Sequence, residues 1–224
     1  MMSPTVTIVF LWIAFAGTHV AFSSLAWRPR LVGMLGDAGF QGAYSVVALA
    51  LFVPMVRVYF QNKHSGPMLW SIGVTPFVEG VVTVGMVLAL IIIVAGTLTP
   101  SPVSITANRE APVVAKGVHL ITRHSVFMAV GLFGLVHLIP NGFASDIAFF
   151  AGFPVFALIG CIHQDQRKLV TDSERYADFH AATPLIPFTG KNALQGLKGI
   201  SPLGYALGIG AAIVLRYFHA QWFG

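Results

Sequence analysis

Long apolar runs without a charged residue constrain this chain more than any other feature of its sequence. At least three of these runs exceed the ~18 uncharged residues that mark a membrane-spanning helix. Charged residues make up 9% of the chain, whereas soluble domains carry about 25%. Mean hydropathy is +0.78, so there are too few polar residues to cover a water-facing surface. The composition therefore predicts an all-α, polytopic membrane protein that lies in a lipid bilayer.

The apolar runs predict about six transmembrane helices in a single domain over residues 1–224. The predicted spans cover residues 5–26, 40–60, 80–98, 124–140, 144–162 and 202–218. A proline-rich linker over 99–116 separates the third span from the fourth. The stretch 163–201 holds nine of the 21 acidic and basic residues, and we expect it to form a cytoplasmic loop.

The distribution of basic residues predicts the orientation. With six spans, ten of the 13 lysines and arginines fall on one side of the membrane, at Arg28, Arg30, Arg109, Lys116, Arg123, Arg167, Lys168, Arg175, Lys191 and Lys198. Lysine and arginine are enriched in cytoplasmic loops, so both termini are expected to lie outside a bacterial-type inner membrane. The net charge of +5 is explained by this topology and by contact with anionic lipid, not by nucleic-acid binding.

Histidines inside or beside the spans are the candidate functional residues, because ionisable groups are expensive in lipid. His19 lies toward the cytoplasmic end of the first span, and His124, preceded by Arg123, opens the fourth span from the same side. His64 and His137 fall toward the opposite side, with Asn141 shortly after His137. His124 and His137 are separated by about 20 Å and about 220° on one helix, so they cannot share a ligand. An interhelical pair of His19 and His124 is therefore favoured.

Two neutral imidazoles on facing helices in an apolar slot suit a six-coordinate haem b iron, with His19 and His124 as metal ligands. Arg123 could contact a haem propionate. The absence of a C-x-x-C-H motif predicts non-covalent binding. No two candidate metal-ligating residues are spaced i, i+3 or i+4, and no carboxylate lies beside a histidine within a span. A structural zinc or di-iron site is accordingly not expected.

Structural interpretations stay open for the same residues. His19 could be an interhelical hydrogen-bond partner, and His124 could be a helix cap. His64 and His137 could serve either a structural hydrogen bond or a site. Cys161, the only cysteine, is expected to pack as a small apolar residue.

Several motifs together resemble the NnrU family. The family pattern is matched from about residue 10 to residue 190. The motifs are His19, Gly42-Ala43-Tyr44-Ser45, Ile121-Thr122-Arg123-His124, His137 and Asn141-Gly142. The resemblance is closest to the 15-cis-zeta-carotene isomerase branch, through Asn62 to Trp70, Asp165-Gln166-Arg167-Lys168-Leu169, Phe179 and Thr183-Pro184-Leu185-Ile186-Pro187-Phe188. The chain departs from the pattern at Ser125, where the family has proline, and at Lys63, which is inserted before His64.

This resemblance implies a membrane protein with haem b, of which His19 and His124 would be the axial ligands. In the isomerase branch, haem redox state controls the cis–trans isomerisation of an apolar polyene. Bacterial NnrU proteins are linked instead to nitric oxide and nitrite metabolism, which implies an alternative, non-catalytic haem protein.

A more remote resemblance connects Arg123-His124 and Glu174-Arg175-Tyr176 with membrane methyltransferases of the isoprenylcysteine type. It implies a second alternative, an S-adenosylmethionine-dependent enzyme. The family's proline after Arg-His, its acidic pair after span five and its second tyrosine are missing here, where Phe179 stands in place of that tyrosine.

Overall fold

A computed structural model describes residues 2–102 and 113–223 of the chain. All regular elements in these two ranges are helical, which confirms the predicted all-α membrane bundle. They are α1 Pro4–Ser23, α2 Arg28–Gln61, α3 Pro76–Leu98, the 3₁₀ helix η1 Gly117–Leu120, α4 Ser125–Leu138, α5 Ala144–Thr171, α6 Ser173–Ala182, α7 Ala193–Lys198 and α8 Pro202–Phe223.

Three of the long helices begin at a serine or threonine followed by proline. The hydroxyl oxygens of Ser3, Thr75 and Ser201 accept hydrogen bonds from Val6, Val78 and Gly204, the backbone N–H groups three residues further on. Such a residue satisfies one of the unpaired donors at a helix start, and proline is suited to the first helical position because its φ is already helical. The start points of α1, α3 and α8 are thus encoded locally.

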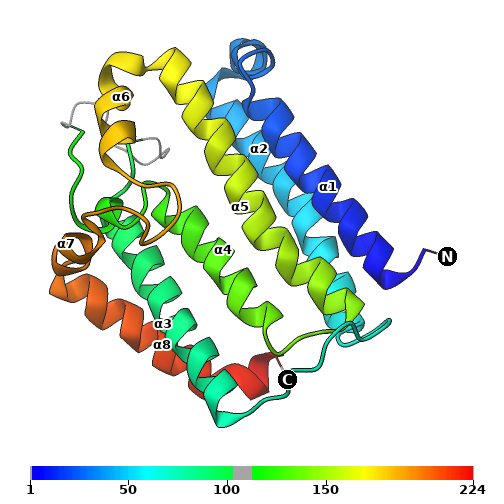
Figure 1. The fold of residues 1–224 in the computed structure, drawn as a ribbon. Helices are drawn as coiled ribbons and strands as arrows, with labels where there is room; N and C mark the ends of the chain where they lie inside the picture. Colours follow the sequence, from blue (N-terminus) through cyan, green and yellow to red (C-terminus); the bar gives the residue numbers. More distant parts are fainter. Residues whose placement is uncertain (1, 103–112, 224) are drawn as a thin grey trace.

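The six main helices pack in the order α2, α1, α5, α4, α3, α8 (Figure 1). One aromatic core joins α1, α2 and α5 through Ile8, Trp12, Phe15, Met55, Tyr59, Phe149, Phe150 and Phe153. A second, aliphatic core joins α3, η1 and α4 to Ile200 at the start of α8. Helix α4 lies between α3 and α5, so it has protein on both sides.

Five helices, α1, α2, α3, α5 and α8, are long and apolar enough to cross a membrane. Helix α4 is also apolar but has 14 residues. Large apolar side chains on the outer helices, such as Ile13, Val46 and Ile213, are about two-thirds exposed in the isolated chain. Lipid is the solvent that suits such a surface, since acyl chains are as apolar as these side chains.

The structure differs most from the predicted boundaries at α5 with the stretch after it and at the start of α2. Helix α5 continues to Thr171, and α6 and α7 follow it, so much of the stretch 163–201 is helical instead of forming a loop. Helix α2 begins at Arg28, earlier than predicted, but it is interrupted at Gly36, whose φ of +71° favours glycine. Residues 103–112 of the predicted linker, which include Arg109, lie outside the described residues.

The close contact of α4 with α5 depends on Gly134. A Cβ added there would lie 2.5 Å from the carbonyl oxygen of Phe150, which is backbone and cannot move aside alone. We expect Gly134→Ala to push the helices apart and to destabilise the protein by about 1–3 kcal/mol. Thermal unfolding in detergent is the measurement. Gly160→Ala on α5 is the control, since a Cβ there meets nothing within 4 Å; an equal loss in both variants would contradict the packing argument.

Candidate functional site

The Arg123-His124 segment leads into α4 and is buried on all sides. Its backbone is held by the loop that follows α6. The N–H of Arg123 donates to the Pro184 carbonyl at 3.0 Å, and the Thr122 hydroxyl donates to the Leu185 carbonyl at 2.6 Å. Non-helical backbone in a membrane protein must find such partners within the protein, because lipid offers none.

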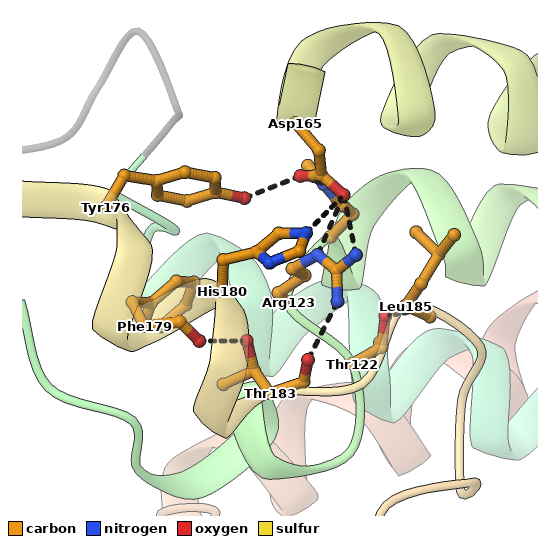
Figure 2. A network of polar contacts seen from close by, with 9 residues as sticks. Thr122, Arg123, Asp165, Tyr176, Phe179, His180, Thr183 and Leu185 are labelled. Carbon is orange, nitrogen blue, oxygen red and sulfur yellow. Dashed lines mark hydrogen bonds and ion pairs between the residues drawn. The ribbon is translucent and has the colours of Figure 1, made fainter. Parts of the chain in front are cut away.

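Asp165, near the end of α5, is the centre of the polar site (Figure 2). One carboxylate oxygen accepts from Arg123, with Nε at 2.8 Å and a terminal guanidinium nitrogen at 2.7 Å. The other accepts from His124 Nε2 at 2.6 Å and from the Tyr176 hydroxyl at 2.5 Å. The Asp165 side chain is 6% exposed. A charge buried to this degree is stable only when it is paired and hydrogen-bonded, as this one is.

Helix α6 closes the site over Asp165. It contributes Tyr176, which is fully buried, and His180, whose Nε2 lies 3.8 Å from a carboxylate oxygen of Asp165. At its end, the Thr183 hydroxyl donates to the Phe179 carbonyl, and the Thr183 carbonyl accepts from Arg123 at 2.7 Å. Figure 2 shows these side chains arranged around the carboxylate. Helices α4, α5 and α6 are therefore joined through one acidic group.

The surroundings of Tyr176 and His180 on α6 shift the pKa of each side chain. Burial, reinforced by the hydrogen bond to Asp165 and its charge, raises the pKa of Tyr176 far above the usual range of a phenol. Burial lowers the pKa of His180, as does the charge of Arg123, although Asp165 opposes the shift. Tyr176 is thus a permanent hydrogen-bond donor at any physiological pH.

The bond to Asp165 also orients His124. A carboxylate that accepts from Nε2 leaves Nδ1 as the nitrogen that could face a ligand. Metal-bound imidazoles are usually oriented in this way, with one nitrogen on the metal and the other donating to a carboxylate or carbonyl. The Arg123 guanidinium is engaged by Asp165 and by the Thr183 carbonyl.

His19 lies half-buried on α1 in an aromatic environment. Its Nδ1 donates to the Phe15 carbonyl at 2.7 Å, which leaves Nε2 as the outward nitrogen. Its ring contacts Phe15, Tyr44 and Phe156, with centroids 4.1, 4.8 and 5.2 Å away. Tyr44 also donates to the His19 carbonyl. The structure gives His19 and His124 different neighbours, and the described contacts do not include one between the two rings.

The remaining predicted residues lie at the opposite end of the bundle. His64 precedes α3, and its Nδ1 donates at 2.8 Å to Asp146 at the start of α5. His137 ends α4; its Nδ1 donates to the Phe133 carbonyl at 2.8 Å, and Asn141 donates to the His137 carbonyl. These residues do not contact the Asp165 site through any described interaction.

The chemical argument from the sequence did not identify Asp165 and Tyr176 as site residues. The sequence shows no carboxylate beside a histidine within a span, yet folding pairs His124 with Asp165 and His64 with Asp146. The sequence did contain one signal for these partners. The apolar core of α5 has an acidic residue near each end, and an acid in a membrane-spanning helix needs a partner. No group of three or more metal-ligating side chains occurs among residues 2–102 and 113–223.

Fold and site together define a polytopic helical membrane protein with a buried, carboxylate-centred polar cluster at one end. The family model described as NnrU protein matches residues 7–224, so the chain belongs to the NnrU family. Searches of curated proteins and of solved structures gave no match.

Removing the charge of Asp165 should destabilise the protein strongly. In Asp165→Asn the Arg123 guanidinium stays buried without its counter-ion, and breaking such a pair costs about 3–5 kcal/mol. Thermal or denaturant unfolding in detergent measures the loss. Asp172→Asn is the matched control, because its pair with Lys168 is partly exposed and should contribute less than about 1 kcal/mol. Equal losses would show that the Asp165 cluster is not a structural centre.

We expect the free energy of unfolding to decrease in mild acid because of His119. It is 5% exposed, and neither ring nitrogen has a hydrogen-bond partner among the described residues. Burial lowers the pKa of His119; the backbone of Thr99 opposes this shift, and Lys116 and His124 add smaller contributions that lower it. The unfolded chain then binds the proton more tightly, so stability decreases below about pH 6.5, by up to about 1.4 kcal/mol per pH unit. His119→Leu should flatten this dependence between pH 7 and pH 5.5, measured against wild type; an unchanged slope would contradict the assignment.

Proposed function

We propose that this NnrU-family protein binds one haem b between His19 and His124 in the cytoplasmic half of the inner membrane. It acts there as a redox-controlled cis–trans isomerase of an apolar polyene. The observation that carries the proposal is the way both imidazoles are held. Each donates one ring N–H to a protein acceptor and keeps the other nitrogen for a ligand.

The two acceptors differ in strength, so the two imidazoles would hold an iron unequally. His124 donates to a carboxylate, Asp165, whereas His19 donates to a neutral backbone carbonyl, that of Phe15. A carboxylate raises the basicity of the imidazole that it accepts from. His124 would therefore be the stronger of the two ligands, and His19 the weaker.

The side chains around His19 are aromatic and would suit contact with a porphyrin or a polyene. Phe156 of α5 contacts His19 and also Phe127, which lies one helical turn after His124. Tyr44 closes another side of His19. The residues of this chain would bind and orient the apolar ligand and exclude water, and the iron would supply the electronic chemistry that eases rotation about a double bond.

An absorption spectrum of the purified protein tests the haem. After expression with added haem precursor, the wild type should show a Soret band, and His19→Ala and His124→Ala should each lose most of it. His180→Ala is the control, because its ring lies beside Asp165 but is not a proposed ligand. A wild type without a Soret band, or variants that keep it, would overturn the haem assignment. Conversion of cis-zeta-carotene by the reduced protein then tests the isomerase, and haem without turnover would favour a carrier linked to nitric oxide or nitrite.

One observation favours a second candidate, a membrane methyltransferase. The adjacent Arg123 and His124 and the distant Tyr176 meet on Asp165, under α6 and the loop after it. This is the region that would cover a methyl donor. Calorimetry with S-adenosylmethionine distinguishes the two: binding that is lost in Arg123→Ala, in a protein without a Soret band, would establish the methyltransferase.

A further inference from the structure

Two arginines near the Asp165 end of the bundle have no acidic partner among residues 2–102 and 113–223. Arg28 begins α2, and Arg167 lies near the end of α5. The Nε of Arg167 is buried without a hydrogen-bond partner, and the groups that act on its charge are Arg28 and Tyr44. Two like charges therefore lie near each other without an acid between them. A buried guanidinium without a counter-ion is unfavourable, so this arrangement calls for an anion from outside the described chain.

One face of α5 leads from His19 to Arg167. The residues on this face, spaced i, i+4, i+7 and i+11 over about 16 Å of helix, are Phe156, Gly160, His163 and Arg167. The ring of Phe156 contacts that of His19 at 5.2 Å between centroids. A Cβ added to Gly160 would meet nothing within 4 Å, so the face is open there. Nε2 of His163, like Nε of Arg167, is buried and unpaired among the described residues. The face thus changes from aromatic to cationic along its length.

Helix α2 connects His19 with Arg28 in the same direction. The Tyr44 ring contacts the rings of His19 and Phe40, with centroids 4.8 and 5.8 Å away. The guanidinium carbon of Arg28 lies 5.5 Å from the centroid of the Phe40 ring. Twelve residues of continuous helix would separate these two by about 18 Å, and the break at Gly36 turns the start of α2 back toward Phe40. The break therefore brings one arginine to the aromatic side chains around His19.

We infer that Arg28 and Arg167 bind the anionic head group of an apolar molecule whose body lies against the aromatic side chains around His19. The head group is a carboxylate or a phosphate, because a planar guanidinium donates two parallel hydrogen bonds to either one. The anion would neutralise the two cations, and partial burial strengthens this attraction. The aromatic rings supply the apolar contact area for the rest of the molecule.

Two kinds of molecule combine these features. A haem carries propionates at one edge of an apolar ring system, and with this ligand the inference rests on the proposed function. An anionic phospholipid carries a phosphate on acyl chains, and with this ligand it does not. Arg123 is already paired with Asp165, whereas Arg28 and Arg167 have no described acid that would compete with the ligand.

Two matched pairs of ligands, each titrated into the full-length protein in detergent, test the inference. Haem b is compared with its dimethyl ester, whose propionates carry no charge, by absorption. Phosphatidylglycerol is compared with phosphatidylcholine by native mass spectrometry. In at least one pair, the wild type should bind the anionic member about tenfold or more tightly than the other. Arg28→Gln/Arg167→Gln should lose this preference. The control Arg30→Gln/Lys191→Gln removes two exposed basic residues and should keep it.

The stability of the protein without haem or added lipid separates a binding role from a structural one. Arg28→Gln/Arg167→Gln removes two like charges that lack an acid, so its melting temperature should be no lower than that of the wild type. A clear decrease would show that the arginines support the fold and would count against the inference.

Three binding results would overturn the inference: no preference in the wild type for either pair, an equal loss in both double variants, or a preference that Arg28→Gln/Arg167→Gln keeps. A wild type that shows no Soret band rejects the haem and, with it, the proposed function. The phospholipid pair alone then decides the inference, so the two failures are distinguishable.

Discussion

A single buried carboxylate organises the polar cluster at one end of the bundle. Asp165 accepts hydrogen bonds from Arg123, His124 and Tyr176, which belong to the entry of α4 and to α6. A carboxylate or guanidinium left alone in such a place would be very unfavourable. Each of these groups therefore requires the others, and together they hold the entry of α4, the end of α5 and α6 against one another.

The same physical constraint acts at the start of α5. Asp146 is completely buried and holds His64 through two bonds, one from the ring and one from the backbone N–H. Ser65 and Ser145 add a reciprocal pair beside it. Helix α5 thus carries one acid near each end of its apolar core, and each acid fixes a segment that is distant in sequence. The packing of α5 against α1 and α4 holds the middle of the bundle together, and these two carboxylates hold its two ends together.

The parts of this structure that could be predicted are those determined by local physics. Uninterrupted apolar runs identify the spans, and Ser-Pro or Thr-Pro pairs mark where α1, α3 and α8 begin. The partner of His124 could not be predicted in the same way, because Asp165 lies 41 residues away and no spacing rule links them. The helical content of 163–201 was missed because α6 is short and polar, and it is stabilised by the contacts of Tyr176 and Phe179 instead of by an apolar run.

The length of α4 connects these observations. Its 14 residues rise about 21 Å, whereas the hydrocarbon core of a bilayer is about 30 Å thick. The chain must therefore enter and leave α4 at a depth where lipid would otherwise surround it. This is why the backbone before α4 is bonded to the loop at 184–188, and why Trp70 donates to the Leu138 carbonyl where α4 ends. His124 and His137 consequently sit at the two ends of a helix that is shorter than the hydrocarbon core, where protein partners replace the water that the backbone would otherwise need.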